Sequence, residues 1–257
     1  MTAQNYDELI ENSFKYIETE DLQSAEIALK EAMKLEPANP RNVLLLSNLG
    51  TIQRQLGKRE DAIISYTAAL SRAPRNVTFL SNRASLYAEM GQPENAITDY
   101  TSLIWIEPNN EDALYERGIL YLQVKNYPAA QTDFEKIIEL NPNTLQGRMG
   151  IASLTKLQKE YDESERIYIF LIDKVQDNAD LYAGRAELYL LMGKNARAMS
   201  DINKSISLNP NDPYTYILRA RVKLLQYEKK SARTDIEKAM SLGYDKKAAE
   251  ELLLLCK

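Results

Sequence analysis

Two residues in this sequence have the types and spacing of a catalytic pair: Ser153 and Lys156, three positions apart. In some hydrolases a lysine at this spacing accompanies a serine nucleophile. Serine and lysine are both common here, so the spacing is expected by chance, and no further part of such a site accompanies it. The chain contains no histidine, which removes the usual general base near neutral pH and the commonest metal ligand. We therefore expect no enzymatic activity and no cofactor or metal.

A second chemical pattern is an arginine followed 16 residues later by an aspartate. It occurs four times, as Arg83 with Asp99, Arg117 with Asp133, Arg185 with Asp201, and Arg219 with Asp235. A guanidinium group can hold a carboxylate through two parallel hydrogen bonds. The constant spacing favours structural ion pairs that join two helices, rather than a ligand site.

Composition excludes several classes of partner. The chain has 257 residues, with 32 basic residues against 37 acidic ones and a net charge of -5. Since no long basic run is present, nucleic acid is not an expected partner. The longest apolar run is only Leu252 to Leu255, so we expect no membrane insertion and no ordinary signal peptide. The single cysteine, Cys256, is compatible with a reducing compartment, and we expect a cytoplasmic protein.

The elements that position these residues follow from a period in the prolines. Pro74, Pro108 and Pro142 are 34 residues apart, and Pro210 lies 68 residues further on. A period of this length indicates a repeat protein. We predict one solenoid over residues 1–257, built from seven blocks of 34 residues: 6–39, 43–76, 77–110, 111–144, 145–178, 179–212 and 213–246.

Each block reads as a pair of helices. Small residues recur at positions 8 and 20 of the block, where they let two helices approach closely. Gly57, Gly91 and Gly193 stand at position 15, where a glycine can take the left-handed conformation that ends the first helix. Pro93 is suited to the first turn of the second helix. Aromatic residues at positions 11 (Tyr16, Tyr87, Tyr121, Tyr189) and 24 (Tyr66, Tyr100, Phe134, Tyr168) are expected in the core.

Small residues at positions 8, 20 and 27, aromatic residues at 11 and 24, and proline at 32 resemble the tetratricopeptide repeat family. The clearest stretches are 82–108 and 116–142. The resemblance implies an all-α fold, a right-handed α-solenoid of seven helix-turn-helix repeats, in which the first helices line a concave groove. The repeat at 145–178 departs most, with Thr155, Ser164 and Gln176 at signature positions. A bend or packing irregularity is expected there.

By the same resemblance, positions 2, 5, 9, 12 and 13 of each first helix line the groove. In the middle and C-terminal repeats these positions combine apolar area with both charge signs, which suits an extended peptide. The predicted peptide-binding residues are Tyr115, Ile119, Leu122, Met149, Ser153, Lys156, Glu187, Tyr214 and Arg221, with Ile217 also in the groove. The alternative is that neighbouring helices curl inward and cover these apolar residues.

A known carboxylate clamp of the family needs lysine at positions 5 and 2. Asn48 and Asn82 stand at position 6, where the clamp has asparagine, but no repeat carries the lysines. Binding of chain-terminal carboxylates by that clamp is not expected.

Residues 246–257 are expected to form a helix that caps the last repeat. Ala249, Leu252, Leu253 and Cys256 make one apolar stripe at helical spacing, whereas Leu254 and Leu255 fall outside it. An exposed leucine there could support a homodimer. Two functions follow: a scaffold that binds a partner protein or peptide in its groove, or a structural component that self-associates through the ends of the solenoid.

Overall fold

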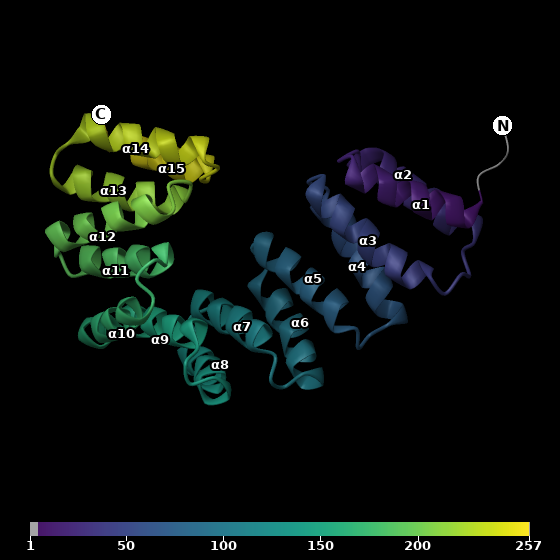
Figure 1. Ribbon diagram of the computed structural model, residues 1–257, viewed down its shortest axis with the longest axis horizontal. Helices are drawn as coiled ribbons and strands as arrows, with labels where there is room; N and C mark the ends of the chain where they lie inside the picture. The colour runs from purple at the N-terminus through teal and green to yellow at the C-terminus, as the bar shows by residue number, and fades with distance from the viewer. Residues whose placement is uncertain (1–4, 257) are drawn as a thin grey trace. The chain divides into compact units, whose positions relative to one another are not determined.

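The computed structural model describes residues 5–256, and every regular element in that range is an α-helix (Figure 1). The predicted all-α fold is confirmed, with two helices in each block. The first helices are α1 (Tyr6–Glu18), α3 (Asn42–Gln55), α5 (Val77–Glu89), α7 (Glu111–Gln123), α9 (Leu145–Leu157), α11 (Ala179–Leu191) and α13 (Pro213–Leu225). The second helices are α2 (Leu22–Leu35), α4 (Arg59–Arg72), α6 (Pro93–Ile106), α8 (Tyr127–Leu140), α10 (Tyr161–Lys174), α12 (Asn195–Leu208) and α14 (Lys229–Ser241). The last pair is followed by α15 (Lys246–Leu254).

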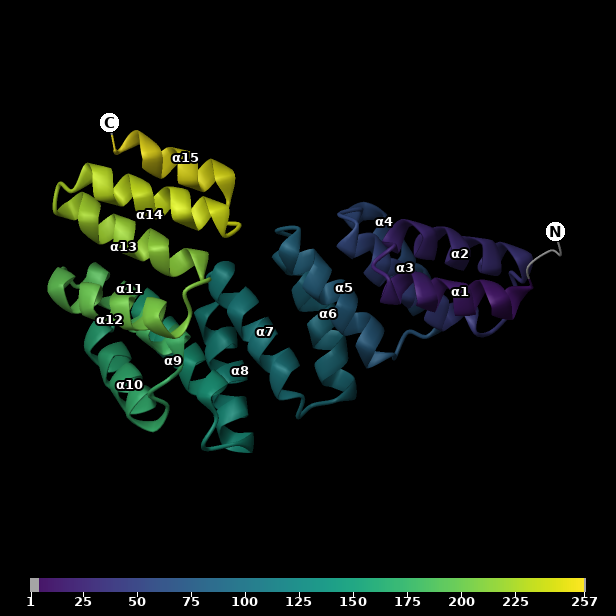
Figure 2. The ribbon, with the colours of Figure 1, turned by 45° about the horizontal axis from the view of Figure 1, so that its top comes forward.

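The helices form two compact units. Unit 1 ends at Leu140 and contains α1 to α8, and unit 2 begins at Asn141 and contains α9 to α15. Within each unit, every helix packs on its partner and each pair packs on the next pair along the chain (Figure 2). This is the solenoid arrangement, in which a repeat buries its apolar faces only against its neighbours.

Polar side chains just before four of the first helices, α5, α7, α11 and α13, fix where those helices begin. Asn76 accepts a hydrogen bond from the backbone N–H of Phe79 at 3.1 Å, and Asn110 accepts one from Ala113 at 2.9 Å. Asn178 and Asp212 cap α11 and α13 in the same way. Each cap satisfies backbone donors that have no partner inside the helix. Because the capping residue is the last of each block, the 34-residue period also sets the helix starts.

The first helix of every pair ends at position 15 in the left-handed conformation. Gly57, Gly91 and Gly193 have φ of 76°, 68° and 70°, as the sequence predicts. The other four repeats adopt the same conformation without glycine, at Glu20 (φ 59°), Lys125 (φ 59°), Lys159 (φ 65°) and Tyr227 (φ 62°). For a residue with a Cβ atom this conformation costs roughly 1–2 kcal/mol.

The two helices of a pair meet where a small residue faces an aromatic one. A Cβ atom added to Gly118 of α7 would lie only 2.5 Å from the Phe134 ring of α8. Tyr66, Tyr100, Phe134 and Tyr168, all at position 24, are at most 4% exposed, which confirms their place in the core. At position 11 the expectation is wrong for Tyr16, which is 38% exposed.

The irregular repeat at 145–178 still forms a helical pair, α9 with α10. Its hydroxyl groups replace apolar contacts with hydrogen bonds: Ser164 donates to the Ala152 carbonyl at 2.8 Å, and Thr155 donates to the Ile151 carbonyl at 2.9 Å. Both residues are buried. The boundary between the two units lies directly before this pair.

The terminal helix α15 packs against α14, beside which it lies in Figure 2. Ala249 is fully buried, and Leu252, Leu253 and Cys256 pack against the same cluster, which includes Ile236 and Ala239 of α14. The predicted apolar stripe therefore faces the last repeat. The helix ends at Leu254, earlier than expected, and Lys257 lies outside the described residues. Leu254 and Leu255 are each 59% exposed.

Candidate binding site

The four arginines at position 7 each hold the aspartate of their own repeat through two hydrogen bonds. In the pair Arg117–Asp133, for example, the guanidinium donates to the two carboxylate oxygens at 2.9 and 2.7 Å. The other three pairs have donor–acceptor distances of 2.7 to 2.9 Å. The aspartates are buried and the arginines are mostly covered. These groups join two helices and leave no charge for a ligand.

In unit 1, the predicted groove residues lie on α7 and differ in accessibility. Tyr115 and Ile119 are half-buried, and the Tyr115 ring lies 6.0 Å from the Phe134 ring. The prediction that Leu122 binds the peptide is corrected, because this side chain is only 8% exposed and offers a ligand little contact area. Ile217 of unit 2 is likewise fully buried. For Leu122 and Ile217, neighbouring helices therefore cover the side chain, as the alternative from the sequence had it.

In unit 2, three of the predicted polar groove residues bind one another across three successive repeats. Lys156 of α9 donates to one carboxylate oxygen of Glu187 of α11, and the Tyr214 hydroxyl of α13 donates to the other at 2.8 Å. Burial raises the pKa of Glu187, but Lys156 and the hydrogen bonds outweigh it, so the pKa lies below its usual value. Burial and the charge of Glu187 raise the pKa of Tyr214. Glu187 is therefore ionised and already compensated.

The remaining predicted residues of unit 2 surround this network. Met149 is half-buried against Ala152 and Tyr168, and Ser153 is also half-buried. Arg221 is exposed and makes no ion pair within residues 5–256. Lys156, which follows Ser153 at the spacing of a catalytic pair, forms an ion pair with Glu187.

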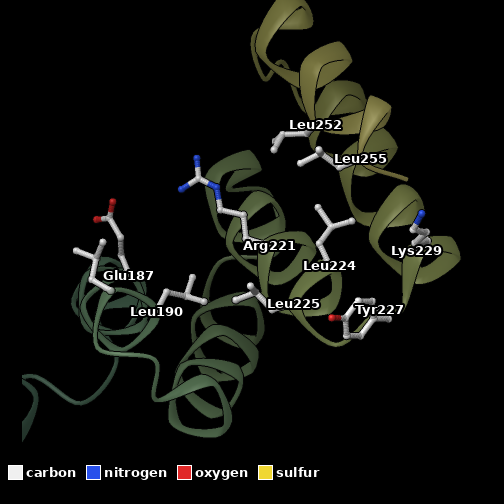
Figure 3. Close-up of a pocket in the computed structure, with 10 residues that line it drawn as sticks. Glu187, Leu190, Arg221, Leu224, Leu225, Tyr227, Lys229, Leu252 and Leu255 are labelled. Carbon is white, nitrogen blue, oxygen red and sulfur yellow. The ribbon is translucent and has the colours of Figure 1, made fainter. Parts of the chain in front are cut away.

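Beside Arg221, the structure contains an open apolar pocket of about 550 Å³ (Figure 3). We call it the leucine pocket, because six leucines form most of its wall: Leu190, Leu191, Leu224, Leu225, Leu252 and Leu255. They come from α11, α13 and the C-terminal end of the chain, and Figure 3 labels all of them except Leu191. Leu191, Leu225 and Leu255 are 54%, 58% and 59% exposed. Apolar area concentrated in one hollow is a common sign of an interaction site.

Tyr227 stands at the rim of the leucine pocket in the left-handed conformation. It is 87% exposed, so its ring contributes little to the packing of the repeat. Strained backbone conformations held by non-glycine residues are concentrated at functional sites. Here, however, the same conformation occurs at position 15 of every repeat, so it follows from the helical pair. The exposure of the Tyr227 ring and its position at the rim make it accessible to a ligand in the pocket.

The rim of the leucine pocket carries charge of both signs, but only part of it is open to a partner. Glu187 is neutralised by Lys156, as described above. Arg221 extends from α13 next to the leucines, as Figure 3 shows. Arg221 therefore offers a partner a positive charge at this rim.

The pocket leucines of α11 and α13 were not predicted from the sequence, although a signal was present. Leu190 and Leu191 stand at positions 12 and 13 of their repeat, as do Leu224 and Leu225 of the next one. These are groove positions by family resemblance. A leucine pair at the same positions of two adjacent repeats could have identified the site.

A buried acidic residue, Glu26 on α2, was also missed. It is 4% exposed and accepts hydrogen bonds from Lys30 at 2.6 Å, Lys58 at 2.5 Å and Gln53 at 3.2 Å. Burial raises the pKa of Glu26, but the hydrogen bonds dominate and lower the pKa to about 2. This network joins the first two repeats and is structural.

Two features are absent from the described part of the chain. Among residues 5–256, no three acidic or cysteine side chains come together as candidate metal ligands. None of the described helices combines the length and apolar character needed to cross a lipid bilayer.

Fold and pocket together define a helical-repeat protein with an exposed apolar pocket formed by two first helices, α11 and α13, and the C-terminal helix. Three tetratricopeptide repeat models match the sequence, at residues 47–113, 111–144 and 179–212. A tetratricopeptide repeat protein from Parabacteroides merdae, known from a crystal structure, is 50% identical over 98% of both chains, with a TM-score of 0.93. The chain belongs to the tetratricopeptide repeat family.

More distant structures share the fold. PilF of Pseudomonas aeruginosa is 20% identical, with a TM-score of 0.59 over 84% of this chain and 97% of PilF. YrrB, described as a tetratricopeptide repeat protein with an unusual peptide-binding site, is 16% identical, with a TM-score of 0.51 over 73% of this chain and 95% of YrrB. At these identities the likeness concerns the fold alone.

Proposed function

We propose that this chain is a non-catalytic scaffold that binds a segment of a partner protein, and that the leucine pocket anchors this segment. Tetratricopeptide repeat proteins are in general protein-interaction scaffolds, and YrrB provides one example with a peptide-binding site. The observation that carries the proposal is the leucine pocket itself, where exposed leucines from three helices meet in one hollow.

The chemistry of the rim specifies the segment further. Leucine walls favour an apolar side chain of the partner, and the Tyr227 ring can cover it, as aromatic residues often do at interfaces. Arg221 favours a carboxylate next to that side chain, since Glu187 is already paired. The preferred segment therefore carries an apolar residue next to an acidic one.

Selection from a random peptide library with the purified chain tests this proposal. We expect enriched peptides that combine an apolar anchor with a neighbouring acidic residue. Leu225→Glu should abolish their binding, because a charge in the apolar wall has no partner. Leu44→Glu is the matched control, since Leu44 is 60% exposed on α3 and lies outside the pocket. Peptides that bind the Leu225→Glu variant as well as the Leu44→Glu variant would contradict the proposal.

The second candidate function is self-association through the end of unit 2, which the exposed Leu254 and Leu255 favour. Light scattering over a range of protein concentrations distinguishes the two functions. A mass that stays that of a monomer removes the homodimer. A concentration-dependent dimer that Leu225→Glu disrupts would assign the leucine pocket to a second copy of the chain instead.

The same proposal includes a cytoplasmic location, in keeping with the single cysteine. Fractionation of cells that express the chain from its own gene tests this part separately.

A further inference from the structure

A second pocket, in unit 1, has the opposite chemistry to the leucine pocket. It has a volume of about 270 Å³ and lies among α5, α6 and α7. We call it the polar pocket, because its wall carries the polar side chains of Thr78, Ser81, Asn82, Tyr100, Asp112 and Glu116. Two of these are carboxylates, and no lysine or arginine lines the pocket.

The hydroxyl of Tyr100 is the first indication that this pocket takes a ligand. Tyr100 is only 4% exposed, yet its hydroxyl has no hydrogen-bond partner among the described residues. The equivalent tyrosine of the preceding repeat, Tyr66, bonds to Thr51 at 3.0 Å. In the repeat of Tyr100, Ser85 stands where Thr51 stood, but Ser85 accepts a hydrogen bond from Arg54 instead. The hydroxyl oxygen itself is not among the fully buried unpaired atoms of the described residues. It is therefore accessible from the polar pocket that Tyr100 lines, where an incoming group can bond to it.

The two carboxylates provide a second, independent indication. Neither Glu116 nor Asp112 makes an ion pair or a side-chain hydrogen bond with any residue in the range 5–256. Partial burial and the charge of Asp112 raise the pKa of Glu116 above its usual value. Arg54, whose charge acts on Tyr100, is itself held by Glu89. The two carboxylates of the pocket are therefore exposed to solvent and have no paired cation in the described chain.

Asn82 completes the wall. Its amide makes no hydrogen bond within the described chain and can both donate and accept. Asn82 occupies one position of the carboxylate clamp discussed above, whose lysines are absent from this chain. In the structure, this asparagine lies beside the acidic side chains of the polar pocket, whereas the clamp would place basic residues there.

We propose that the polar pocket binds a cationic side chain, an arginine or a lysine, of a partner segment. A guanidinium or ammonium group supplies only hydrogen-bond donors, which match Glu116, Asp112 and the oxygens of Tyr100 and Asn82. Only two acidic side chains line the pocket, and no group of three acidic or cysteine side chains in the described part of the chain could hold a metal ion. A water molecule occupies about 30 Å³ of liquid volume, so the pocket has room for a long side chain and bound water.

The proposal concerns unit 1 and does not depend on the leucine pocket of unit 2. Its test is a nuclear magnetic resonance titration of the isotope-labelled full chain with N-acetyl-arginine methylamide. The neutral control probe is the citrulline analogue, which has nearly the same shape. We expect arginine to shift amide signals of α5 and α7 around the pocket, and citrulline to leave them in place. N-acetyl-lysine methylamide in a parallel titration shows which cation is preferred.

Variants make the assignment specific. Glu116→Gln should weaken arginine binding about tenfold, as expected for the loss of one charged hydrogen bond. Tyr100→Phe removes only the hydroxyl and should weaken binding by a smaller factor without disturbing the core. The matched control is Glu111→Gln, which removes a charge from the same helix outside the pocket.

Four results would overturn the proposal. These are an absence of arginine-dependent shifts, equal shifts with citrulline, equal affinity of the Glu116→Gln and Glu111→Gln variants, or the same shifts on addition of magnesium or calcium alone.

Discussion

At the scale of single residues, buried charges in this chain serve to join helices. Glu26 of α2 connects the first two repeats through Lys58, which directly precedes α4, and through Gln53 of α3. Four aspartates are held by arginines in the same manner. Both kinds of site make stability depend on ion pairs inside the fold.

The Glu26 site predicts a loss of stability in acid. Its pKa is about 2 in the folded chain, against an ordinary value of 4.5. A lowered pKa contributes stability above the ordinary value, and this contribution is lost as the pH falls from about 4.5 to about 2. Glu26→Gln should therefore lower the urea midpoint at neutral pH and do so less near pH 2. Glu11→Gln, on an exposed helix surface, is the control. An equal effect of Glu26→Gln at both pH values would contradict the assignment.

The Arg117–Asp133 pair predicts a large cost for removing one partner. The Asp133 side chain is 3% exposed and that of Arg117 is 15% exposed. Asp133→Ala should destabilise the chain by about 3 kcal/mol, because it leaves a largely buried guanidinium without its partner. Removing Glu139, which pairs with Lys136 on the surface, should cost only about 0.2–1 kcal/mol. Denaturant unfolding of both variants gives the comparison, and equal effects would show that burial is not decisive.

At the scale of elements, the end of each first helix has the same backbone conformation with different side chains. Glycine occupies position 15 in three repeats, and four other repeats place a residue with a Cβ atom there. The conformation is therefore imposed by the helical pair and not by the residue. Tyr227 differs from the other three in lining a pocket.

This difference predicts opposite effects of one substitution on stability and on binding. Tyr227→Gly should stabilise the chain by about 1 kcal/mol, because glycine adopts the left-handed conformation without strain. It should also lower the affinity for the peptides that bind the leucine pocket, since the ring at the rim is lost. Lys125→Gly is the matched control, expected to stabilise by a similar amount and leave binding unchanged. Thermal unfolding and peptide affinity are measured for both variants. Unchanged affinity of Tyr227→Gly would remove the tyrosine from the site.

At the scale of the whole molecule, stability in a repeat array is a sum of repeats and their interfaces. The last repeat has one neighbouring pair, and α15 covers its other side. Deleting residues 245–257 should lower the thermal midpoint and increase amide exchange in α13 and α14 before it affects unit 1. The double variant Leu254→Glu with Leu255→Glu, which changes only exposed side chains of this helix, should leave the midpoint in place. A truncated chain as stable as the full one would show that α15 is not a cap.

The sequence predicted what the local rules and the 34-residue period determine. Gly57 at a helix end, Pro93 in a first turn and the Arg117–Asp133 pair follow from residue type and position within the repeat. Accessibility does not follow in this way. Leu122 and Leu190 share position 12, yet the first is 8% exposed and the second lines the leucine pocket. Exposure depends on the helices that surround a position, which a repeat pattern does not specify.

Position 15 also has a consequence for how such an array can diversify. Because the chain holds this backbone conformation regardless of the side chain, a single codon change there installs a new group on the surface without altering either helix. The cost is about 1 kcal/mol per site, small enough for a lineage to tolerate at several repeats. Duplication followed by substitution at this one position would give each repeat its own recognition residue on an unchanged framework.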